Sequence, residues 1–172
     1  MSALKKKSDC DNKKDKDNKS LFLFCGQGVS TVFLGTENDT RPPIPPSSRI
    51  AEVEADTRGM DRPVIEIEFS SIVNLLSFPG FDDDAASLSF LLFRAQDDNE
   101  PVLVNSWPYE VFEMEEVSNI RLSTSFVFNF CECLDTSGCF TYFVEVSGGG
   151  IRNGSLGINN VEIAALVGES CC

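Results

Sequence analysis

Strict alternation of apolar and polar residues is the feature that most constrains the fold of this chain. Residues 64–69 read VIEIEF, so three apolar residues fall on one face of an extended segment and two glutamates on the other. Residues 122–130 place Phe126, Phe128 and Phe130 on one face in the same way. A period of two is that of a β-strand with one buried face. Both segments are therefore predicted to be strands.

Similar short runs recur along the whole chain and are separated by turn residues. They lie at 21–25, 29–34, 50–56, 88–93, 102–104 with 110–112, 140–146 and 161–167. We count about eight strands, and no run reads as a convincing helix of more than about ten residues. The predicted class is all-β, an antiparallel β-sandwich of the jelly-roll kind, with an immunoglobulin-like sandwich as the alternative. The fourteen phenylalanines fit a core between two sheets.

Charge divides the chain into a leader and a body. All seven lysines and four aspartates lie in residues 1–19, which gives 7 − 4 = +3, and the remainder carries 7 − 23 = −16. The polar, aperiodic leader 1–19 is predicted to be a disordered connector. The β-sandwich domain is predicted at 20–168 and a cysteine-bearing tail at 169–172.

An acidic body repels phosphate backbones, so we expect no nucleic-acid partner. No apolar run approaches the ~18–20 residues that span a bilayer, so we expect no membrane insertion. No apolar h-region directly follows the lysines, which predicts synthesis in the cytoplasm without a secretory signal.

Histidine is absent from the sequence. The commonest general base, the usual hydrolase triads and the commonest metal ligand are therefore missing, and we expect neither an enzyme nor a cofactor. Glu66 and Glu68, about 7 Å apart on one strand face, suit a carboxylate glycosidase, but any exposed strand supplies that spacing.

Seven cysteines cannot all pair within one chain. Cys10, Cys171 and Cys172 lie near the ends, where they can reach another molecule. With Cys25, they are the candidates for disulfides between subunits. The alternative is that the terminal cysteines are inert.

The densest cluster is Cys131, Cys133 and Cys139. The first two share a strand face, and residues 134–138 are predicted to form a hairpin that returns Cys139 beside Cys133. An intrachain disulfide, reduced thiols, and a zinc site with a fourth ligand from elsewhere all remain open. We expect a structural cluster without a catalytic metal.

Several stretches together resemble a known family. They are LFCGQG at 23–28, VIEIEFSS at 64–71, FVFNFCEC at 126–133 with Cys139 and TYFVE at 141–145, and IAALVG at 163–168. They resemble domain-of-unknown-function family number 4489 of spore-forming Firmicutes, mainly clostridia. That family implies no known activity.

The layout also resembles, more loosely, the spore-appendage subunits of bacilli. Those subunits are short jelly rolls without signal peptides, and cysteines in an N-terminal connector cross-link them into fibres. The resemblance implies that the leader with Cys10 is such a connector, although a single cysteine departs from a paired-cysteine connector.

The function hypothesis is a self-assembling structural subunit of a spore-surface or extracellular filament, whose partner is itself. It would be made in the mother-cell cytoplasm, oxidised after release and cross-linked through its terminal cysteines. The alternative is a monomeric carbohydrate- or calcium-binding jelly-roll module, and a carboxylate glycosidase is the third hypothesis.

Overall fold

The computed structural model describes residues 21–34, 47–77, 84–97, 99–113, 121–152 and 154–169. The predicted disordered leader 1–19, with Cys10, and Cys171 and Cys172 of the predicted tail lie outside the described residues. Within them the protein is all-β, as the alternation predicts, and it contains no helix that could span a membrane.

Ten strands make up the described fold. They are β1 (Phe22–Cys25), β2 (Gln27–Gly28), β3 (Thr31–Leu34), β4 (Ser48–Asp56), β5 (Pro63–Ser77), β6 (Asp84–Gln96), β7 (Val102–Glu113), β8 (Arg121–Cys133), β9 (Cys139–Arg152) and β10 (Gly154–Glu169).

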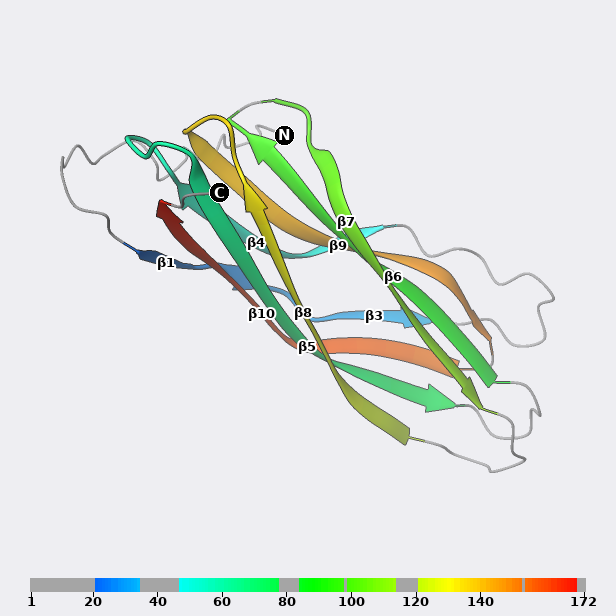
Figure 1. The fold of residues 1–172 in the computed structure, drawn as a ribbon. Helices are drawn as coiled ribbons and strands as arrows, with labels where there is room; N and C mark the ends of the chain where they lie inside the picture. The colour runs from blue at the N-terminus through cyan, green and yellow to red at the C-terminus, as the bar shows by residue number, and fades with distance from the viewer. Residues whose placement is uncertain are drawn as a thin grey trace, which may run out of the picture.

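The strands form two antiparallel sheets that lie face to face (Figure 1). Sheet A has the order β1-β10-β5-β8, with β3 also paired to β10, and sheet B has the order β2-β4-β9-β6-β7. From β3 onward every connection passes between the sheets, except that from β6 to β7. The short strands β1 and β3 lie along β10 in sheet A, and β2 between them pairs with β4 in sheet B. Counted as one interrupted strand, these three give the eight-strand order of a jelly roll. The predicted fold class is confirmed.

The two apolar runs at 102–104 and 110–112 are continuous across Pro108. Residues 102–104 and 110–112 belong to a single strand, β7, in which Pro108 lies opposite Ser89 of β6. Proline lacks a backbone donor and is tolerated in sheets at edge strands. In the described structure β7 is an edge strand of sheet B, so the strand continues through Pro108.

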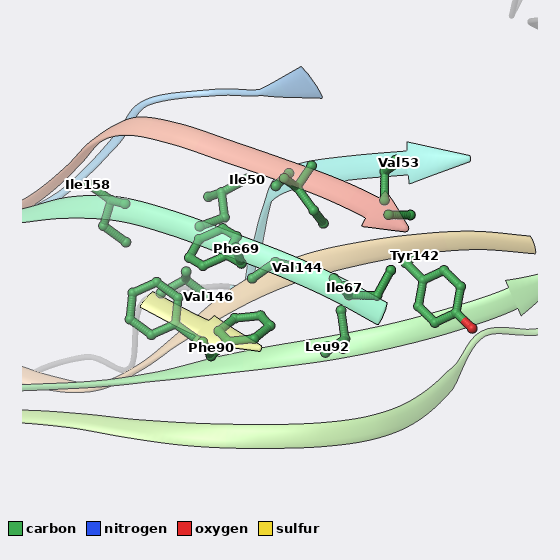
Figure 2. Close-up of a cluster of buried hydrophobic side chains, with 14 of the residues drawn as sticks. Ile50, Val53, Ile67, Phe69, Phe90, Leu92, Tyr142, Val144, Val146 and Ile158 are labelled. Atoms are coloured by element: carbon green, nitrogen blue, oxygen red, sulfur yellow. The ribbon is translucent and has the colours of Figure 1, made fainter. Parts of the chain in front are cut away.

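The core lies between the two sheets and is rich in aromatic rings. Figure 2 shows Phe69 of sheet A and Phe90 of sheet B close together, with ring centroids 5.8 Å apart. Phe90 stacks on Phe126 at 3.9 Å, and Trp107 stacks on Phe128 at 3.8 Å. The predicted inner face of 64–69 is confirmed, because its three apolar side chains are buried.

Residues 26–28 carry the chain from sheet A to sheet B and explain the Gly-Gln-Gly sequence. The backbone N–H of Gly26 donates to the Ile163 carbonyl of β10, whereas Gly28 pairs with Ala51 of β4. A Cβ on Gly26 would lie 2.2 Å from the Glu52 carbonyl oxygen. A Cβ on Gly28 would lie 2.0 Å from the carbonyl oxygen of Val161. Only glycine permits such close approach of backbones.

The connection after β8 differs from the predicted hairpin. Cys133 ends β8 in sheet A and Cys139 begins β9 in sheet B, so residues 134–138 cross from one sheet to the other. Leu134 is buried, and its N–H donates to the Pro63 carbonyl at 2.8 Å. Burial of this leucine at the end of the sandwich outweighs the local preference of a short loop for a hairpin.

Candidate functional site

Both edges of sheet A contain long stretches without charge. Residues 21–34, which form β1 to β3, contain no Asp, Glu, Lys or Arg, and neither do residues 122–131 of β8. Among the described residues, β8 pairs only with β5, and β1 and β3 pair only with β10. Charged side chains on edge strands normally prevent pairing with other chains. This protection is missing at both edges of sheet A.

The same edges expose large apolar side chains. Leu21, Leu23 and Leu34 are 65–74% exposed at one edge, and Val127 is 65% exposed at the other. Such side chains favour contact with another apolar surface, since burying one of them fully contributes roughly 1.5–3 kcal/mol.

The outer face of sheet A, the side turned away from the core, brings together residues that are distant in the sequence. Cys25, Ala164, Glu68 and Asn129 lie in one row across the four strands β1, β10, β5 and β8. Leu23, Leu166, Glu66 and Cys131 form the adjacent row.

A groove of about 530 Å³ crosses this outer face. Its lining includes Cys25, Glu68, Val127, Asn129 and Glu162. Glu68 and Glu162 are exposed, and no lysine or arginine lines the groove. The groove therefore combines apolar surface with two carboxylates whose charges are not neutralised by a cation in its lining.

The described cysteines fall into two kinds. Cys25 and Cys131 are exposed free thiols on the outer face of sheet A, whereas Cys133 and Cys139 are disulfide-bonded. Thus Cys131 differs from the other two members of its cluster. The described residues contain no group of three or more His, Cys, Asp or Glu side chains that could hold a metal ion.

Glu132, between Cys131 and Cys133, points into the sandwich and joins its two sheets. The Tyr142 hydroxyl of β9 donates to Glu132 Oε1 at 2.5 Å, and Arg94 Nη1 of β6 donates to Oε2 at 2.6 Å. Arg94 and Tyr142 lie directly opposite each other in sheet B. One carboxylate thus connects β8 to two strands of the other sheet.

Burial raises the pKa of the Tyr142 hydroxyl well above its ordinary value, and the Glu132 carboxylate raises it further. The phenol therefore keeps its proton and remains a donor to the carboxylate. The sequence interpretation did not include this bridge. The strand alternation could have indicated it, because the residue between two outward-facing cysteines at i and i+2 faces inward.

Glu66 and Glu68 lie on the outer face of β5, as the alternation predicts. Their nearest cross-strand neighbours on β10 are Leu166 and Ala164, and those on β8 are Cys131 and Asn129. The pair lies on an open sheet face, where Glu68 forms part of the groove.

Comparison with protein families identifies the body of the chain. A family model described as Domain of unknown function (DUF4489) matches residues 20–168. A search of curated proteins finds none that matches. The match covers all ten strands of the sandwich except the last residue of β10.

Proposed function

We propose that this chain, which belongs to the DUF4489 family, is a non-catalytic structural subunit that assembles with copies of itself into a filament. The observation that supports this best is the pair of uncharged, apolar edges on opposite sides of sheet A. An unprotected edge offers backbone N–H and C=O groups to an extended strand of another chain.

The opposite placement of the edges favours a growing assembly over a closed one. If β8 of one copy pairs with β1 and β3 of the next, the contact is head-to-tail and uses two different surfaces. Such heterologous contacts produce open filaments unless the rotation between copies closes a ring. Each new copy then presents the same free edge as the one before.

Covalent cross-links would follow this non-covalent contact. Cys25 ends β1 at one of the pairing edges and carries an exposed free thiol. Cys10, Cys171 and Cys172 remain the other proposed sites of linkage. Two thiols would join by losing two protons and two electrons to dioxygen or to a small-molecule disulfide. This chemistry suits an oxidising location such as a spore surface or the extracellular space.

The experiment is negative-stain microscopy with size-exclusion chromatography of the protein under oxidising conditions. Leu23→Lys and Val127→Lys place a charge at the two edges of sheet A. Leu103→Lys is the matched control, because Leu103 is 51% exposed on β7, the edge strand of the other sheet. Losing ~1.5 kcal/mol of apolar burial corresponds to about tenfold weaker association.

We expect filaments from the wild type and from Leu103→Lys, and at least about tenfold weaker association for the two sheet A variants. A wild-type protein that stays monomeric in oxidising solution at every concentration would refute self-assembly. Loss of filaments in Leu103→Lys alone would move the contact to sheet B and refute the proposed edges.

A further inference from the structure

We propose that the groove on the outer face of sheet A binds residues 5–7 of a neighbouring copy, the three consecutive lysines of the leader. This inference rests on the proposed self-assembly and names the contact that would add to edge pairing. The groove is the acceptor, with Glu68 and Glu162 as the charged partners, and the lysine side chains are the ligand.

Charge complementarity is the first reason. The two groove carboxylates are exposed and no basic side chain lines the groove. All seven lysines of the chain lie in residues 1–19, so any lysine that reaches this groove comes from the leader. The run at 5–7 contains no acidic residue, whereas the later pair Lys14 and Lys16 encloses Asp15.

The spacing of the charges is the second reason. Glu162 lies opposite Ser70 and Ala164 opposite Glu68, so the two glutamates are diagonal neighbours on adjacent strands. Diagonal neighbours are about 7–8 Å apart. In an extended segment, Lys5 and Lys7 point the same way and lie about 6.6–6.8 Å apart. One extended turn-free segment therefore brings one ammonium group to each carboxylate.

The chain leaves β1 on the side away from the groove, so the occupant is assigned to a neighbouring copy on the strength of the proposed self-assembly. The described chain begins at Leu21, beyond the Phe22 end of β1, whereas the groove begins at the Cys25 end. A leader would have to reverse its direction to enter the groove of its own body. Fourteen residue steps separate Lys7 from Leu21, and these span at most about 46–50 Å. A neighbouring groove within that distance of Leu21 is therefore within reach of the lysines.

The test exchanges the charges between full-length chains. All of them carry Cys10→Ser, Cys171→Ser and Cys172→Ser, so that no terminal cysteine can capture the contact as a disulfide. Chain X carries Glu68→Lys and Glu162→Lys, and chain Y carries Lys5→Glu and Lys7→Glu. The matched control for X carries Glu100→Lys and Glu110→Lys, two exposed glutamates away from the groove. The readout is the rate at which brief alkylation modifies the Cys25 thiol, resolved from Cys131 by peptide mass spectrometry.

At a concentration ten times the dissociation constant, occupancy should slow Cys25 alkylation in the unexchanged chain about tenfold. Salt at 1 M shortens the Debye length to about 3 Å and should remove this protection. X and Y alone should be unprotected, the control should remain protected, and an equal mixture of X and Y should regain protection.

Recovery in the mixture requires binding between chains, since neither chain matches itself. A mixture that reacts as the mean of X and Y would overturn the proposal, as would protection that 1 M salt leaves unchanged. Filaments formed by the unexchanged chain without Cys25 protection would reject the groove contact while leaving the proposed function intact. A monomeric wild type would instead reject the self-assembly itself.

Discussion

Tyr142→Phe isolates the bridge that holds the two sheets together beneath the Cys-Glu-Cys sequence. The change removes one hydroxyl from a fully buried ring and leaves the ring's packing in place. It deletes the 2.5 Å hydrogen bond to Glu132 Oε1. The expected result is a folded protein with a lower free energy of unfolding.

The magnitude follows from the partners that remain. A hydrogen bond to a charged group contributes about 1.5–3 kcal/mol. After the substitution, Glu132 still accepts from Arg94 at 2.6 Å, and its side chain is 17% exposed, so water can approach the vacated oxygen. Both factors limit the loss, and we expect about 2 kcal/mol. With a urea m-value of about 2 kcal/mol/M, the unfolding midpoint falls by about 1 M.

Equilibrium unfolding in urea at pH 7 without reductant measures this shift. Fluorescence of Trp107, the single tryptophan, reports separation of the sheets because its ring stacks on Phe128 of the other sheet. Tyr109→Phe is the matched control, since its hydroxyl makes no hydrogen bond in the described part of the chain. A double-mutant cycle that combines Tyr142→Phe with Glu132→Gln isolates the interaction free energy between these two side chains. Equal midpoints for the two tyrosine variants would refute the bridge.

Two further predictions concern pH and the strand crossing. Because the pKa of Tyr142 is raised in the folded state above its ordinary value of 10.0, its contribution to stability is fully present below pH 10. This contribution falls by up to about 1.4 kcal/mol per pH unit above that, and urea titrations at pH 9 to 11 should show a smaller decline in Tyr142→Phe. Gly26→Ala should lower the melting temperature by at least about 4 °C, since its Cβ would lie 2.2 Å from a backbone oxygen. Gly157→Ala, whose Cβ meets only ordinary contacts, should change the melting temperature little, and equal effects of the two substitutions in calorimetry would contradict the close approach at Gly26.

Local alternation was sufficient to predict which face of residues 64–69 is buried. Burial of Ile65, Ile67 and Phe69 follows from a period of two, which depends only on neighbouring residues. The length of each strand was harder to predict from the sequence. Pairing with neighbouring strands extends β5 to Ser77, well beyond the alternating segment. Edge position likewise explains why β7 continues through Pro108, and edge position is a property of the whole sheet.

Residues brought together by topology could not be identified from spacing. Glu132 meets Arg94 and Tyr142 from strands 38 and 10 residues away. The groove joins Cys25 to residues in the middle of β10, which become neighbours only when β1 pairs with that strand. The crossing at 134–138 shows the same limit, since a five-residue loop fits a hairpin until the burial of Leu134 is known.

The distribution of charge in sheet A is the reverse of the one that keeps a β-sandwich monomeric. Its inner strands carry Glu66, Glu68 and Glu162 on the outer face, although their backbone groups are already paired with neighbours. Its edge strands carry no charge over residues 21–34 and 122–131, where backbone groups are open to a new strand. Charges on the inner strands cannot block edge pairing, but they do oppose stacking of two such faces, because like charges would meet. The same pattern thus disfavours face-to-face contact between bodies and leaves the edges as the available route for association, while the carboxylates remain accessible to a basic segment.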